Sequence, residues 1–208
     1  MKTNQKIILA SGSPRRAALL KSAGLDFKVI VPQIDEAPQP GEAPNAFVCR
    51  TAREKADSLP ANDAVILAAD TAVVDGARIL GKPTDVKDAA AMLRSLSGRT
   101  HEVMTGVCLR FPERTLCFHV ETSVTFRPLS EEEIGDYVAS GEPMDKAGAY
   151  AIQGGAAKMV RRIDGSYSNV VGLPLCEVIE QLNSSARIEN QMSQNPTSEI
   201  SSRPRLGL

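Results

Sequence analysis

Apolar runs and stretches of helical periodicity alternate through the first part of the chain. The runs at 6–10 and 27–32 predict two strands, and the run at 64–70 has the pattern of a fully buried central strand. A helix is expected between the first two strands, where a serine precedes a proline, and another at about 45–59. This alternation of strands and helices is typical of an α/β fold.

Hairpin signals interrupt the alternation after residue 70. An Asp-Gly pair within 72–80 predicts a tight hairpin. Two runs of alternating polarity on either side of the Pro-Glu-Arg sequence at 112–114 predict a long antiparallel pair of strands. Three further helices and one further strand are expected, the helices at 84–98, 130–140 and 173–183 and the strand at 158–163.

The order of these elements predicts one α/β domain over residues 1–183. We expect a mixed, partly antiparallel central sheet flanked by helices, with residues 72–130 forming a second lobe and a ligand-binding cleft between the two lobes. From residue 184 the chain is polar and loses all periodicity, so we expect 184–208 to be a disordered C-terminal tail.

Composition narrows the classes of function. The 208 residues carry a net charge of −1 and contain 4% aromatic residues without tryptophan, which argues against nucleic acid as a partner. No apolar run approaches the roughly 20 residues of a membrane span, and the apolar part of the N-terminus is too short for a signal peptide. The cysteines form no CxxC pair, which favours reduced thiols in the cytoplasm over a zinc site or disulfides; they are Cys49, Cys108, Cys117 and Cys176.

The two histidines offer no metal site. His101 and His119 lie within predicted strands, with no second histidine or cysteine at metal-ligand spacing, so we expect both on the surface. No Gly-x-Ser-x-Gly sequence is present, and nothing supports a Ser-His-Asp triad.

The sequence Ser-Gly-Ser-Pro-Arg-Arg at 11–16 has the pattern of an anion-binding site. It follows a predicted strand and opens a helix, whose free N–H groups and dipole favour negative charge. Arg15 and Arg16 add guanidinium groups suited to phosphate oxygens, and the dipole makes this a poor place for two cations unless an anion binds. Two solvated surface arginines are the alternative interpretation.

Two pairs of polar residues follow predicted strands. Asp70 ends the buried run at 64–70 and Thr71 follows it, and the carboxyl end of a strand is where α/β folds place chemistry. A turn or capping role is an equal alternative. Asp35 and Glu36 lie in the loop after the second strand, where a solvated acidic pair is the plainer interpretation.

Further candidates lie in a turn, a helix and a glycine-rich segment. Lys82, between a glycine and a proline, sits in a rigid turn that can aim it at a phosphate, although most such turns are structural. Lys55, taken alone, belongs to a charged, solvated helix face. The segment 140–155, which contains Gln153, is rich in glycine and alanine and permits close approach of the backbone to a ligand.

Eight motifs together resemble those of the Maf family of nucleotide pyrophosphatases. They keep their order and spacing over residues 6–183: "ASGSPRR", "DE" at 35–36, "AREKA", "AADT", "GKP", "LSGRTHEVMTG", "SGEPMDKAGAYAIQG" and "IDGSYSNVVGLP". The resemblance implies a fold related to the inosine triphosphatases of the Maf/Ham1 type. It also implies hydrolysis of a nucleoside triphosphate to the monophosphate and pyrophosphate, with a divalent metal cation, Mg²⁺ or Mn²⁺, as cofactor.

The resemblance also assigns residue roles. Asp70 matches the general base, and Glu36 matches a position at the metal. Substrate discrimination falls on three residues, Arg15, Thr71 and Gln153. Phosphate binding falls on Ser11, Ser13, Arg16, Lys55 and Lys82.

Two motifs indicate the substrate. "DKAGAYAIQG" and "SYSNVVGLP" resemble the branch that acts on dTTP and UTP, whereas the branch that acts on 7-methyl-GTP carries a cysteine in the first of these stretches. Pyrophosphatases of 7-methyl-GTP or of purine or modified nucleotides, and a non-catalytic regulator of septum formation that binds a nucleotide, are the alternatives. The expected partner is the nucleoside triphosphate, with no nucleic acid and no membrane. The resemblance further implies a homodimer.

Overall fold

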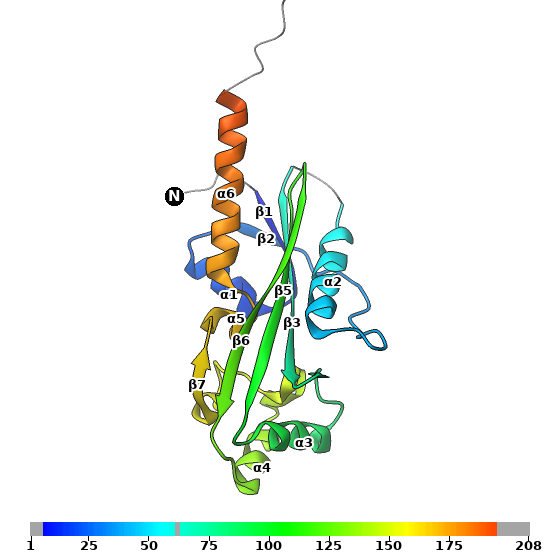
Figure 1. Ribbon diagram of the computed structural model, residues 1–208, viewed down its shortest axis with the longest axis vertical. Helices are drawn as coiled ribbons and strands as arrows, with labels where there is room; N and C mark the ends of the chain where they lie inside the picture. Colours follow the sequence, from blue (N-terminus) through cyan, green and yellow to red (C-terminus); the bar gives the residue numbers. More distant parts are fainter. Residues whose placement is uncertain (1–5, 61–62, 195–208) are drawn as a thin grey trace, which may run out of the picture.

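One mixed sheet of seven strands organises the part of the chain that the structure describes. The computed structural model describes residues 6–60 and 63–194, and its strands follow the order β2-β1-β3-β5-β6-β7, with β4 paired to β3 (Figure 1). The strands are β1 (Ile7–Ala10), β2 (Phe27–Val29), β3 (Val65–Asp75), β4 (Arg78–Leu80), β5 (Thr100–Arg110), β6 (Thr115–Phe126) and β7 (Val160–Asp164).

The sheet combines parallel and antiparallel pairs. Strand β1 pairs in parallel with β2 and β3, whereas the pairs β3–β4, β3–β5, β5–β6 and β6–β7 are antiparallel. The long strands β3, β5 and β6 run along the long axis of the molecule (Figure 1). The prediction of a mixed, partly antiparallel sheet is therefore confirmed.

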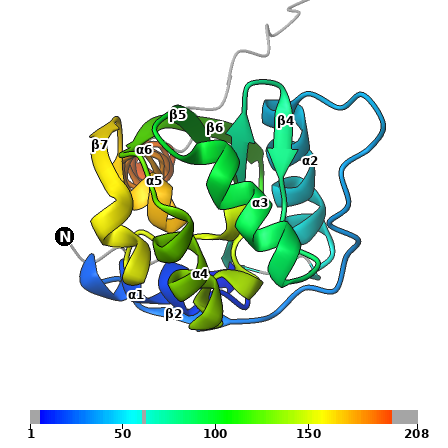
Figure 2. The same ribbon diagram turned by 90° about the horizontal axis from the view of Figure 1, so that it is seen from below.

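Helices cover both faces and one end of the sheet. They are α1 (Pro14–Ser22), α2 (Pro44–Asp57), α3 (Val86–Leu96), α4 (Glu131–Ala139), α5 (Tyr167–Val171) and α6 (Leu175–Gln194). Helix α2 lies on one side of the sheet and α1, α5 and α6 on the other, and the view from below shows α3 and α4 over one end (Figures 1 and 2). No described helix is both long and apolar enough to cross a bilayer.

The alternation of side chains along β3 explains these layers. Leu67 belongs to the core beneath α1 and α6, and its neighbour Ile66 to the core beneath α2. Gly106 of β5 lets α2 approach closely, because a Cβ there would lie 2.2 Å from the carbonyl oxygen of Val48. A third core joins the far ends of β3, β5 and β6 to α3 and α4.

The predicted starts of two helices are confirmed. Ser13 is the N-cap of α1 and accepts a hydrogen bond from the backbone N–H of Arg16, with Pro14 in the first turn. Ser130 and Glu133 form the expected capping box at the start of α4.

Three predicted boundaries are wrong. Strand β2 ends at Val29 instead of residue 32. Strand β3 continues past Asp70 to Asp75, because the Asp-Gly turn prolongs it into the hairpin with β4. Helix α6 runs to Gln194, beyond the predicted end at 183 and into the segment 184–208 that we expect to be disordered.

Polar contacts continue this helix. Ser185 is buried, and its hydroxyl accepts a hydrogen bond from Arg114 and donates to the carbonyl of Gln181. The prediction of disorder therefore does not hold for 184–194, and its remainder, 195–208, lies outside the described residues.

The prediction for His101 is also wrong, because this side chain is buried. It is 2% exposed and stacks edge-on against Phe126 and Tyr150, and its Nε2 lies 2.9 Å from the Tyr150 hydroxyl. Burial lowers the pKa of His101 to about 4. His119 is partly exposed, as predicted, and lies beside Glu121.

Candidate active site

A cleft of about 670 Å³ opens at the edge of β3. All ten site residues that the motifs single out line it: Ser11, Ser13, Arg15, Arg16, Glu36, Lys55, Asp70, Thr71, Lys82 and Gln153. They come from the loop after β1, the first turn of helix α1, the loop before α2, helix α2, strand β3, the turn after β4 and the segment before β7. The fold thus gathers in one place residues that are up to 142 positions apart in the sequence.

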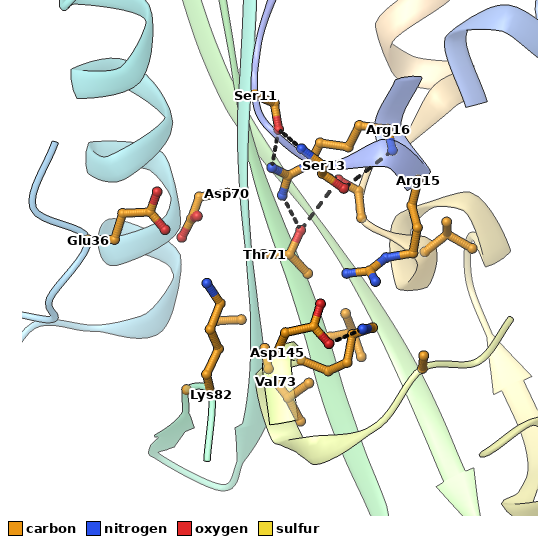
Figure 3. A pocket seen from close by; sticks show the side chains of 18 of the residues that line it. Ser11, Ser13, Arg15, Arg16, Glu36, Asp70, Thr71, Val73, Lys82 and Asp145 are labelled. Atoms are coloured by element: carbon orange, nitrogen blue, oxygen red, sulfur yellow. Dashed lines mark hydrogen bonds and ion pairs between the residues drawn. The ribbon is translucent and has the colours of Figure 1, made fainter. Parts of the chain in front are cut away.

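The pairing of β3 explains where the cleft forms. Strand β1 pairs with β3 up to Ala68, and β4 pairs with β3 from Val73 onward. Between these partners, Asp70 and Thr71 lie in the middle of β3 with neither strand beside them. Successive side chains of a strand point to opposite faces, so Asp70 faces α2 and Thr71 faces the loop after α5 (Figure 3).

On the α2 side, Lys55 joins two carboxylates. Its Nζ lies 2.7 Å from Asp70 Oδ1 and 2.9 Å from Glu36 Oε1. Lys55 and Asp70 are buried, whereas the Glu36 side chain is 49% exposed. The structure shows no hydrogen bond or ion pair to Asp70 Oδ2 from any described residue, so that oxygen is available to a ligand or a water molecule.

Asp35, the neighbour of Glu36, takes no part in the cleft. Its carboxylate accepts a hydrogen bond from the backbone N–H of Ala37 at 2.9 Å, which makes it a turn residue.

On the opposite side, Arg16 is a buried link between three segments. Its Nε donates to the carbonyl of Gly172 at 2.7 Å, Nη1 donates to Ser11 Oγ at 3.1 Å, and Nη2 donates to Thr71 Oγ1 at 3.0 Å. These bonds hold the loop after β1, strand β3 and the end of α5 together. Arg16 is therefore 9% exposed and engaged with the protein, which makes it a positively charged support for the cleft.

The hydrogen-bond pattern of Ser11 suits an anion. Ser11 Oγ accepts from Arg16 Nη1 and also from the backbone N–H of Ser13 at 3.2 Å. Because both lone pairs are engaged, the hydroxyl hydrogen remains for an acceptor such as a phosphate oxygen. The Ser13 hydroxyl serves as the cap of α1.

Arg15, Lys82 and Gln153 have free polar groups at the cleft. The structure shows no hydrogen bond or ion pair between these three side chains and the rest of the described chain. Arg15 and Lys82 extend into the cleft from opposite walls (Figure 3). Asp145 and Lys146 form an ion pair on the wall that also carries Gln153.

Comparison with known proteins gives the family. A model of the Maf-like proteins matches residues 6–185. The chain belongs to the Maf family. The dTTP/UTP pyrophosphatase of Geobacter sulfurreducens is 58% identical to this Maf protein over 181 residues, which cover 85% of this chain and 95% of that protein. The dTTP/UTP pyrophosphatase of Shigella sonnei is 52% identical over 179 residues, 85% of this chain and 91% of that protein.

Among solved structures, the Ham1 protein of Staphylococcus aureus matches this Maf protein with a TM-score of 0.45 and 14% sequence identity. The match covers 87% of this chain and 99% of that chain.

Two polar residues behind Thr71 lie within the quoted motifs, which assign them no role. Thr105 and Asn169 are fully buried and lie one and two hydrogen bonds away from the Thr71 hydroxyl. A signal for Thr105 exists in the sequence, because this polar residue occupies a position of the predicted strand whose neighbours of the same parity, Val103 and Val107, are apolar.

The acidic residues of the cleft suit a metal that binds together with its substrate. Among residues 6–60 and 63–194, no group of three or more acidic, histidine or cysteine side chains forms a cage for an ion. Glu36 and Asp70 supply two carboxylates on either side of Lys55. Mg²⁺ is commonly bound by one or two carboxylates together with substrate phosphates, so the residues present fit such an ion.

Burial and charge act in opposite directions on the Arg16 guanidinium. Burial lowers the pKa of Arg16, and the negative charges of Asp70 and Glu36 oppose that shift. The carboxylates of Asp70 and Glu36, on one side of β3, thus help to keep Arg16 positively charged on the other side.

Proposed function

We propose that this Maf protein hydrolyses dTTP and UTP to the nucleoside monophosphate and pyrophosphate. The observation that carries the proposal is the cleft itself, where Asp70 lies among cationic side chains and has one oxygen without a partner among the described residues. Five cationic side chains and three acidic ones line the cleft: Arg15, Arg16, Lys55, Lys82 and Lys146 against Glu36, Asp70 and Asp145. A triphosphate carries roughly four negative charges, and such a surplus of cations stabilises both its binding and the leaving pyrophosphate. The names of the two relatives support the choice of dTTP and UTP.

Asp70 is the proposed general base. Lys55 holds Oδ1 at 2.7 Å and so orients the carboxylate, while Oδ2 can accept the proton of an attacking water molecule. In phosphoryl transfer the protein contributes mainly by positioning the reacting groups and by stabilising charge, and these side chains can do both.

Arg15, Lys82 and the Ser11 hydroxyl are the proposed phosphate contacts. Arg15 and Lys82 reach into the cleft from opposite walls, and Ser11 offers a hydrogen. Glu36 would hold the divalent cation together with phosphate oxygens; when bound, the cation would neutralise charge on the triphosphate. Lys55 is proposed to hold Asp70 and Glu36 in place instead of binding a phosphate, because both of its contacts are carboxylates of the protein.

Arg15, Thr71 and Gln153 are the proposed discriminating residues. Gln153 is exposed at the wall of the cleft, and its amide offers both a donor and an acceptor to the edge of a base. A site that pairs with one base edge rejects bases that leave its polar groups unpaired.

The test is a panel of nucleoside triphosphates with Mg²⁺, scored by kcat/KM for monophosphate production. We expect dTTP and UTP to be cleaved well and ATP and GTP poorly. A preference for 7-methyl-GTP would contradict the substrate assignment, and binding without turnover of any nucleotide would favour the non-catalytic regulator.

We further propose a homodimer in the cytoplasm. The resemblance of the motifs to the Maf family supports the dimer, and the unpaired cysteines among the described residues agree with a reducing compartment. Light scattering on the purified protein checks the dimer, for which a mass twice the 22.2 kDa of the chain is expected.

A further inference from the structure

A chain of buried hydrogen bonds leads from the cleft into the sheet behind Thr71. Thr71 lies directly opposite Thr105 of β5, and their hydroxyl oxygens are 2.9 Å apart. Thr105 is fully buried and donates to the backbone carbonyl of Asn169 at 3.2 Å. The Asn169 side chain, also fully buried, donates to Thr122 Oγ1 and to the carbonyl of Val103 at 3.0 Å each. This series of hydrogen bonds therefore ties the orientation of the Thr71 hydroxyl to the buried part of the sheet.

These hydrogen bonds determine the direction in which the single hydrogen of the Thr71 hydroxyl points. Arg16 Nη2 donates to Thr71 Oγ1, which occupies one lone pair. When Thr105 donates to the carbonyl of Asn169, Thr71 donates to Thr105. When Thr105 instead donates to Thr71, Thr71 has the carbonyl of Gly172 as its acceptor, at 3.4 Å. In both arrangements the hydrogen of Thr71 stays within the protein, and the first leaves one lone pair for a ligand.

We propose that Thr105 is a positioning residue that keeps Thr71 an acceptor and thereby selects uracil and thymine over cytosine. This inference rests on the proposed function, in which Thr71 lies beside the base. Uracil and thymine carry a hydrogen on ring N3, whereas the N3 of cytosine is an acceptor. An acceptor facing the N3 of cytosine leaves two polar groups unpaired, and a site of this kind discriminates strongly.

The replacement Thr105→Val tests the inference, because valine keeps the shape and removes the hydroxyl. The remaining acceptor for Thr71 is then the carbonyl of Gly172, which already accepts from Arg16 at 2.7 Å. Because the contact of Thr71 with that carbonyl is long, at 3.4 Å, the N3 of cytosine can compete for the Thr71 hydrogen. We expect the ratio of kcat/KM for UTP to that for CTP to fall about tenfold, with CTP gaining relative to UTP, which is the order of one hydrogen bond.

Two further variants separate positioning from packing. Thr105→Ser keeps the hydroxyl and should restore the preference for UTP. Thr51→Val is the matched control, because Thr51 is also fully buried and its hydroxyl has no hydrogen-bond partner among the described residues, so its loss should leave the ratio unchanged. Melting temperatures of all variants report any general loss of structure.

The outcomes are distinct. If Thr105→Val lowers kcat/KM for UTP and CTP by the same factor, Thr105 supports the fold alone and the inference is overturned. A wild-type enzyme that cleaves UTP and CTP equally contradicts both the inference and the proposed base preference. A wild type that prefers UTP while Thr105→Val keeps that preference contradicts the inference and leaves the proposed function standing.

Discussion

Replacing Lys55 by methionine should destabilise the protein more than replacing Asp70 by asparagine. Lys55 is the cation between Asp70 and Glu36, at 2.7 and 2.9 Å. Without it, a buried carboxylate faces a second carboxylate with no charge between them. Asp70→Asn, by contrast, leaves Lys55 paired with Glu36, whose side chain is half exposed. The geometry therefore predicts an asymmetry between the two ends of one ion pair.

The magnitude follows from burial. Breaking a buried ion pair from one side typically costs about 3 to 5 kcal/mol, and because Glu36 is half exposed we expect about 3 kcal/mol for Lys55→Met. Asp70→Asn should cost about 1 kcal/mol, since a hydrogen-bonding group remains at the site. For a domain of this size these values correspond to falls in melting temperature of roughly 6–12 °C and roughly 2–4 °C.

Thermal and urea unfolding of both single variants and of the double variant measure the effect. The double variant should be more stable than Lys55→Met alone, because it also removes the buried Asp70 charge that Lys55→Met leaves unpaired. Lys87→Met, at an exposed position of α3, is the control for the loss of a lysine. Equal costs for the two single variants, or strict additivity in the double variant, would refute the reasoning.

Two other predictions concern the base and pH. Gln153→Ala should reduce the preference for dTTP and UTP over purine triphosphates more than it lowers the best kcat/KM, and a uniform loss on all substrates would assign Gln153 to catalysis or folding. His101 has a pKa of about 4 in the folded protein against 6.5 when unfolded, so its contribution to stability is present above pH 6.5 and is lost as pH falls toward 4. Unfolding should show about 2 kcal/mol less stability at about pH 5 than at about pH 7.5, a difference that His101→Phe should remove; an equal loss in that variant would contradict the assignment.

The order of elements could be predicted from the sequence because each has a local signal. The Ser13 cap, the Asp-Gly turn at 75–76 and the Ser130 capping box depend on residues within a few positions of one another, and all three are confirmed. The cleft residues could be identified from the sequence because they lie in short motifs, whose order and spacing can be recognised without knowing the fold.

The remaining features depend on distant contacts. Asp70 lies within β3 instead of at its end, because β4 returns to extend the sheet after β1 has stopped. Burial of His101 requires Phe126 and Tyr150, which are 25 and 49 positions away. Arg16 is engaged by Gly172 and Thr71, and no local pattern predicts that the first of two adjacent arginines faces the cleft while the second supports it.

The most direct test of the account is the identity of the products that wild type and Asp70→Asn release from dTTP in the presence of Mg²⁺. Chromatography with a pyrophosphate assay should show dTMP and pyrophosphate in equal amounts for the wild type. Turnover should fall roughly 10²-fold or more in Asp70→Asn, the usual scale for losing a general base, while nucleotide binding survives. Release of dTDP and inorganic phosphate, or near-normal turnover by Asp70→Asn, would contradict the account.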